Sequence, residues 1–99
     1  MNHEPIYISR IPLEDGRVLV AREQLSIRVE KAGTYHKGFI DSPVDAVVYA
    51  KDRYELGVNC CDEIANIWNV FESMRDDQFS DELREDWRKM REFFSIENG

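Results

Sequence analysis

A chain of 99 residues, of which 42% are hydrophobic and 11% aromatic, fits one domain and supplies enough apolar side chains for a packed core. Its formal net charge of −7 at pH 7 disfavours direct binding to nucleic-acid phosphates, because that binding requires clustered cations. The longest apolar run, residues 46–50, is too short to span a membrane, and the first ten residues lack the pattern of a secretory signal. We therefore expect a single acidic domain over residues 1–99, with no membrane association.

Acidic residues are concentrated in the second part of the chain. Residues 1–40 contain six Lys/Arg and five Asp/Glu, whereas residues 41–99 contain seven Lys/Arg and fifteen Asp/Glu. The net charges of the two parts are therefore +1 and −8. An acidic surface of this kind suits a partner protein with a basic surface, and it also promotes solubility.

The two cysteines, Cys60 and Cys61, are adjacent. Vicinal cysteines form a strained and uncommon disulfide, and two residues cannot provide the framework of a small secreted protein. We therefore expect reduced thiols and a cytoplasmic location.

The first forty residues have the alternation and the turn signals of two β-hairpins. Strand-forming stretches occupy residues 5–11, 16–21, 25–31 and 34–40. Residues 25–31 give the clearest signal, because apolar and polar side chains alternate with the period of a half-buried strand. Gly16 and Gly33 mark turns, since glycine readily adopts positive φ. Residues 21–25 also fit a short helical turn, so the count of four strands remains open.

Three helices are predicted after residue 40, over about residues 43–56, 59–77 and 80–95. The first has Ser42 as its N-cap, Pro43 at its first position and Gly57 as its C-terminal stop. The second is the strongest helix prediction, because its apolar residues are spaced by three and four over its whole length. The third begins after Ser80, which is a favourable N-cap.

Strands that precede helices in the sequence predict an α+β fold. We expect an antiparallel sheet of about four strands from residues 5–40, with the three helices packed on one face. Because no helix separates the predicted strands, parallel βαβ units and the cofactor sites that depend on them are not expected.

The sequence contains no motif for phosphate binding, metal binding or catalysis. Its glycines do not have the spacing of a phosphate-binding loop. The possible metal ligands His3, His36, Cys60 and Cys61 match no zinc-site spacing. Cys61 with His36 is the available thiol–imidazole pair, and such a pair occurs by chance in most chains. We therefore predict a non-enzymatic protein with no catalytic residues, no metal site and no cofactor.

One group of residues in the predicted strands has the composition of a sheet that stacks single-stranded bases. Arg10, Arg28 and Lys37 are cationic, and Tyr35 and Phe39 supply aromatic rings near them. The same aromatic residues fit a hydrophobic core equally well. Because the helical part is so acidic, direct nucleic-acid binding is not expected.

The most acidic stretch lies in residues 72–86. Asp81 and Glu82 follow the Ser80 cap, where the helix dipole favours negative charge, and Glu85 has cations within helical reach. Asp76 and Asp77 are different, because they would lie at the C-terminal end of the helix over residues 59–77, where the dipole disfavours anions.

A partner-binding surface would explain these two aspartates. Phe79 lies beside them and is either an anchor on the core or an exposed contact. The candidate partner-binding residues are Glu72, Asp76, Asp77, Phe79, Asp81, Glu82 and Glu85.

Two classes of function follow from the sequence. The first is a small acidic inhibitor that covers a basic, nucleic-acid-binding surface of a partner protein, with carboxylates in place of phosphates. Anti-CRISPR and anti-restriction proteins of phages and mobile elements share this size and charge. The second is an antitoxin, an immunity protein or a regulatory subunit that binds through apolar surface, with a homodimer as one form of it. Trp87, Phe93 and Phe94 are its candidate contacts.

Overall fold

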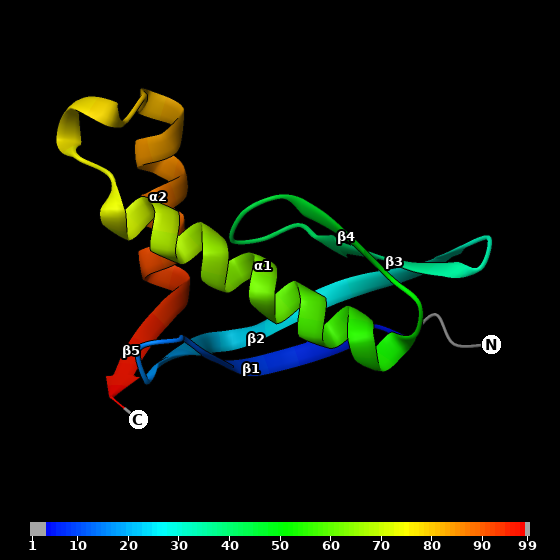
Figure 1. The fold of residues 1–99 in the computed structure, drawn as a ribbon. Helices are drawn as coiled ribbons and strands as arrows, with labels where there is room; N and C mark the ends of the chain where they lie inside the picture. Colours follow the sequence, from blue (N-terminus) through cyan, green and yellow to red (C-terminus); the bar gives the residue numbers. More distant parts are fainter. Residues whose placement is uncertain (1–3, 99) are drawn as a thin grey trace.

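The computed structural model describes residues 4–98 and has an α+β fold (Figure 1). Its elements are β1 (Ile6–Pro12), β2 (Arg17–Ala32), β3 (Tyr35–Ile40), β4 (Ala46–Ala50), α1 (Arg53–Ser73), the 3-10 helix η1 (Asp76–Gln78), α2 (Asp81–Phe93) and β5 (Phe94–Asn98). The sheet is antiparallel throughout, as predicted. It has five strands where about four were expected, and the described residues form two α-helices where three were expected.

β2 is a single strand of 16 residues that forms the centre of the sheet. It includes residues 17–21 and residues 25–31, which were predicted to belong to separate strands. Both predicted hairpins are therefore present, as β1–β2 and β2–β3, but no break separates them at residues 21–25. β1 pairs with β2 along one edge, with a register shift between Ile8 and Arg10. The other edge of β2 pairs with β5 over residues 17–21 and with β3 over residues 27–32.

Residues 46–50 form strand β4 and not part of a helix. β4 pairs with β3, buries Val48 and Ala50, and exposes Val47 and Tyr49. This two-residue alternation competes with the helical spacing that predicted a helix over residues 43–56. β-Branched and aromatic side chains fit a pleated surface well, and pairing with β3 decides the outcome.

α1 begins six residues before the predicted start of the second helix and ends four residues before its predicted end. Asp52 is the N-cap, since its side chain accepts a 2.8 Å hydrogen bond from the backbone N–H of Glu55. Gly57 therefore lies inside α1, not at a helix end. The buried side of α1 agrees with the predicted apolar spacing and consists of Leu56, Cys60, Ile64, Trp68 and Phe71.

α1 lies across one face of the sheet and contacts β1, β3 and β4 (Figure 1). Rows of side chains from β1, β2, β3 and β4 lie beneath it, such as Ile6, Ile27, Ile40 and Ala46. Leu56 of α1 is fully buried and belongs to the core between the helix and the sheet. No helix within residues 4–98 is long and apolar enough to cross a membrane.

α2 follows the prediction of a helix over residues 80–95 at its start and departs from it at its end. Ser80 is the N-cap, and its hydroxyl oxygen accepts a 3.2 Å hydrogen bond from the N–H of Leu83. The helix ends at Phe93, because the chain continues as β5 and Phe94 is buried against the core. The first turns of α2 project beyond the end of the sheet and do not pack on its face (Figure 1).

Candidate protein-interaction surface

The acidic stretch predicted from the sequence lies on a projecting arm made of the end of α1, η1 and α2. α1 ends where Met74 adopts an extended backbone, with φ −75° and ψ 142°. The next turn is closed by two hydrogen bonds: the N–H of Arg75 donates to the side-chain oxygen of Gln78 at 2.8 Å, and the N–H of Gln78 donates to the carbonyl of Arg75 at 2.9 Å. The short turn η1 therefore separates the two helices and reverses the chain.

A stack of aromatic rings fixes this arm to the core. The ring of Phe79 stacks on Phe71 with centroids 6.2 Å apart, and Phe71 stacks on Trp87 at 5.4 Å. Trp87 meets Trp68 of α1 edge-on at 4.7 Å. Because Phe79 is half-buried in this stack, it anchors the turn on the core, which is one of the two roles expected for it.

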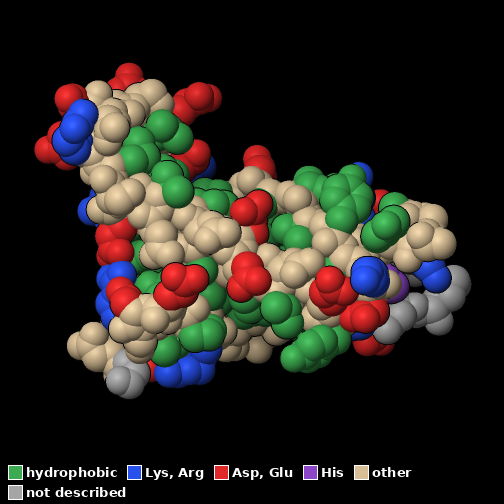
Figure 2. Space-filling view, viewed as in Figure 1, with side chains coloured by type: hydrophobic (Ala, Val, Ile, Leu, Met, Phe, Trp, Pro, Cys, Tyr) green, Lys and Arg blue, Asp and Glu red, His purple; other side chains and the backbone are tan. Residues whose placement is uncertain are grey.

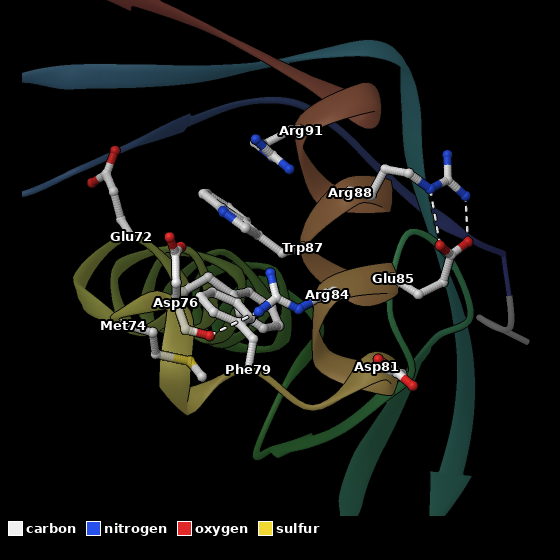
Figure 3. A pocket seen from close by; sticks show the side chains of 11 residues that line it. Glu72, Met74, Asp76, Phe79, Asp81, Arg84, Glu85, Trp87, Arg88 and Arg91 are labelled. Atoms are coloured by element: carbon white, nitrogen blue, oxygen red, sulfur yellow. Dashed lines mark hydrogen bonds and ion pairs between the residues drawn. The ribbon is translucent and has the colours of Figure 1, made fainter.

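Two arginines of α2 contact aromatic rings on the side of the arm that faces the end of α1. The guanidinium of Arg84 lies 5.6 Å from the centre of the Phe79 ring and donates a 2.8 Å hydrogen bond to the backbone carbonyl of Asp76. Arg91 lies 5.2 Å from the centre of the Trp87 ring. These groups line a groove of about 500 Å³ between the end of α1 and α2 (Figure 3). Both cations are thus engaged by neighbouring groups of their own chain.

Three of the predicted contact residues form ion pairs within the molecule. Glu72 binds Arg17 of β2, with both guanidinium–carboxylate distances at 2.7 Å. This hydrogen-bonded arginine lowers the pKa of the Glu72 carboxyl. Glu85 binds Arg88, which lowers the pKa of Glu85 as well. Asp77 lies 3.3 Å from Arg75, and both side chains are largely exposed.

The remaining predicted acids, Asp76, Asp81 and Glu82, are exposed, and within residues 4–98 no cation lies within ion-pair distance of them. We call residues 76–86 the acidic tip. It contains six acidic residues and one arginine, for a net charge of −5. Figure 2 shows acidic side chains gathered around the end of the arm.

The expected electrostatic anomaly at Asp76 and Asp77 is not present. α1 ends at Ser73, so the two aspartates do not lie at the C-terminal end of a helix. They lie instead in the first turn of η1. Negative charge at the start of a helical turn is favourable, and local structure accounts for both residues. What distinguishes the tip is therefore its exposure and its charge, not a strained position.

The residues expected to form an apolar contact surface are not exposed. Phe94 is 2% exposed, and Phe93 and Trp87 are half-buried in the aromatic cluster. The exposed apolar residues lie elsewhere, and they include Tyr54 at 83% and Val58 at 42%, both on the first half of α1. Neither residue was among the contacts predicted from the sequence.

The cations and rings of the predicted base-stacking group share the face of the sheet opposite α1. Arg28 lies 4.3 Å and Lys37 4.8 Å from the centre of the Phe39 ring. These aromatic residues are therefore not core residues. Arg28, however, is paired with Glu30 at 3.0 Å and with Asp41 at 3.6 Å. The carboxylates reduce the positive charge of this face, which weakens its fit to phosphates.

The thiols lie in the middle of α1 and not at a helix start. Cys60 is fully buried, and burial raises the pKa of its thiol to about 12. Burial also raises the pKa of Cys61, which is half-buried. His36 is on β3 beside Ala50 of β4, whereas Cys61 lines a groove beside β1 at the opposite edge of the sheet. The structure therefore does not bring the thiol and the imidazole together, and within residues 4–98 no metal-ligating cluster is found.

Comparison of the chain with protein-family models, with curated proteins and with solved structures finds no match.

Proposed function

We propose that this chain is a small, non-enzymatic interaction domain whose acidic tip binds a basic surface of a partner protein. The observation that carries the proposal is the charge of the tip on a projecting and well-anchored arm. Three of its carboxylates, Asp76, Asp81 and Glu82, are exposed and have no ion-pair partner within residues 4–98. Free carboxylates on a rigid support attract cationic groups over the range of a Debye length, about 10 Å at 0.1 M salt.

The partner that best fits this surface is a protein with a nucleic-acid-binding site. Such sites are lined with Lys and Arg that contact phosphates. The tip presents carboxylates at a helix start and a neighbouring turn, so that several anions enter one basic site together. The resulting effect is inhibition of the partner by exclusion of its nucleic acid, as in anti-defence proteins of phages and mobile elements.

Pull-down experiments with charge-matched variants test the proposal. In the tip variant, D76N/D81N/E82Q, three exposed carboxylates become neutral, and the net charge changes from −7 to −4. The control variant E14Q/E23Q/D62N makes the same change in net charge at exposed acids outside the tip. Wild type, tip variant and control are immobilised, exposed to a bacterial lysate, and eluted with rising salt.

We expect at least one basic protein to bind wild type and the control variant and to be lost from the tip variant. Its affinity for wild type should decrease as salt rises, because exposed charges are screened. If the tip variant and the control variant retained the same basic proteins equally, the proposal would be contradicted. Binding would then depend on the net charge of the chain and not on the acidic tip. Retention of the same proteins in high salt would contradict it as well.

A further inference from the structure

We propose that the free edge of β1 pairs with the same edge of a second copy of the chain, so that the sheet continues through a two-fold homodimer. Strand edges present unpaired backbone N–H and C=O groups and are templates for pairing with another chain. β1 pairs with β2 on one side only, and its other side is the border of the sheet, alongside the first half of α1 (Figure 1). This inference is independent of the function proposed for the acidic tip.

The border beside β1 is mainly apolar, and none of the described residues that line it is a carboxylate. A groove of about 800 Å³ runs between residues 5–10 and the first half of α1. Its α1 side is lined by Arg53, Tyr54, Gly57, Val58 and Cys61. In a chain with twenty acidic residues, such a border is the part of the surface where two copies meet with the least electrostatic repulsion.

The cations at this border are already neutralised or bonded within their own chain. Arg53 donates hydrogen bonds to the backbone carbonyls of Glu4 at 2.6 Å and Pro5 at 2.9 Å. Arg10 forms a 2.7 Å ion pair with Glu97 of β5. Both side chains are thus held by groups of their own chain, and most of the other residues that line the border are apolar. The same border on a second copy has this composition.

The opposite edge of the sheet, at β4, is arranged differently. The side-chain amide of Asn59 donates a 3.2 Å hydrogen bond to the backbone carbonyl of Tyr49 in β4. Asp62, Glu63 and Asn66 line the same shallow groove between α1 and β4. Two copies that met at this edge would bring four carboxylates together. Carboxylates at an edge protect it from pairing with a second copy, and none of the described residues that line the β1 border is a carboxylate.

The register shift in β1 limits which residues pair. The shift lies between Ile8 and Arg10, so the regular part of the edge precedes it. We therefore assign the contact to residues 6–8 of both copies, in antiparallel orientation around a two-fold axis near Tyr7. In this arrangement Ile6 of each copy lies beside Ile8 of the other on the face covered by α1, and the exposed side chains of Tyr54 and Val58 cover the junction.

Such a dimer keeps the acidic tips free. The contact uses the first half of α1, and the tip follows the end of this helix of 21 residues, which is about 30 Å long. The two tips are therefore far from the two-fold axis and do not face each other closely. A homodimer would present two acidic tips. Once one tip is bound to a partner with two basic sites, the second tip is held at a high effective concentration near the other site, which raises the overall affinity.

Sedimentation equilibrium of the full chain and two valine variants tests the inference. Val58→Glu places a carboxylate at the junction, and Val70→Glu makes the same change at an exposed valine of α1 outside it. Wild type and Val70→Glu should dimerise equally, whereas Val58→Glu should raise the dimer dissociation constant at least about tenfold, or about 1.4 kcal/mol. Circular dichroism verifies that both variants are folded.

Thiol cross-linking locates the contact. Tyr7→Cys places a thiol near the proposed axis, and Val47→Cys places one on the β4 edge. With a short bis-maleimide, Tyr7→Cys should give a covalent dimer, while Val47→Cys and wild type should not. A chain that stays monomeric up to about 1 mM would overturn the inference. A dimer that Val58→Glu does not weaken, or that cross-links through Val47→Cys, would overturn it too.

Discussion

Arg17 on β2 and Glu72 near the end of α1 form an ion pair with two parallel hydrogen bonds, each 2.7 Å long, although the residues are 55 positions apart. Arg17 also binds Asp15 in the turn that precedes β2. The pair therefore links the sheet, the β1–β2 turn and the base of the arm. Its two-pronged geometry restricts how α1 lies on the sheet more than a single contact would.

This pair predicts a pH-dependent contribution to stability. Because Arg17 lowers the pKa of Glu72 in the folded state, the contribution is present above the ordinary glutamate pKa of 4.5 and is lost as the pH falls through the lowered folded-state value. Glu72→Gln should therefore lower the free energy of unfolding at pH 7 and have little effect near pH 2. Urea denaturation at a series of pH values measures this difference. Asp76→Asn is the control, and a similar pH-dependent difference for it would contradict the assignment.

Phe79→Ala should loosen the acidic tip. The substitution removes the ring that stacks on Phe71 and supports Arg84. Because Phe79 is half-buried, we expect a loss of about 2 kcal/mol, below the roughly 3–5 kcal/mol of a fully buried phenylalanine. Chemical denaturation measures the loss, and amide exchange of residues 75–82 should accelerate more than that of α1. Unchanged exchange in this segment would show that the ring does not anchor the turn.

Two glycines should respond to alanine in opposite directions. A methyl group at Gly38 of β3 would lie 3.1 Å from Ile27 and 3.1 Å from Leu56, both fully buried, so Gly38→Ala should destabilise the chain by about 1–3 kcal/mol. A methyl group at Gly57 inside α1 meets its nearest neighbour, Ile6, at 3.9 Å. Gly57→Ala should therefore stabilise the helix by about 0.5–1 kcal/mol. Thermal and urea unfolding of the two variants measure both effects.

The sign for Gly57 tests the boundaries of α1 directly. If Gly57 ended a helix in the left-handed conformation, as the sequence suggested, alanine would destabilise the chain there. A loss of stability in Gly57→Ala would therefore contradict the helix that runs through this position.

The two cysteines should be unreactive in the folded protein. The pKa of Cys60 is raised to about 12 and that of Cys61 is also raised, so little thiolate exists at pH 8. With a disulfide reagent such as DTNB, both thiols should react slowly in buffer and rapidly in urea. Fast modification of one thiol in the folded state would show that Cys61 is accessible as a thiolate.

Local signals in the sequence predicted those parts of the fold that depend on neighbours in the chain. The alternation in residues 25–31, the turns at Gly16 and Gly33, and the cap at Ser80 all have their predicted roles. The α+β class followed from the order of strands and helices, and the acidic character of residues 76–86 followed from composition. These features rest on short-range geometry and on which residues are charged, and both are properties of the sequence alone.

Tertiary pairing decided what local signals left ambiguous. Residues 46–50 fit a helix and a strand almost equally. Backbone pairing with the edge of β3 decides that they form strand β4. β2 continues through residues 21–25 because β1 and β5 pair with its first part, and Phe94 joins β5 because β2 offers an open edge there. The same applies to the acidic residues of the arm: the sequence supplied the carboxylates, but only the fold paired Glu72 with Arg17 and left Asp76 without an ion-pair partner among residues 4–98. Contacts between residues far apart in the chain set these outcomes, and no local pattern records them.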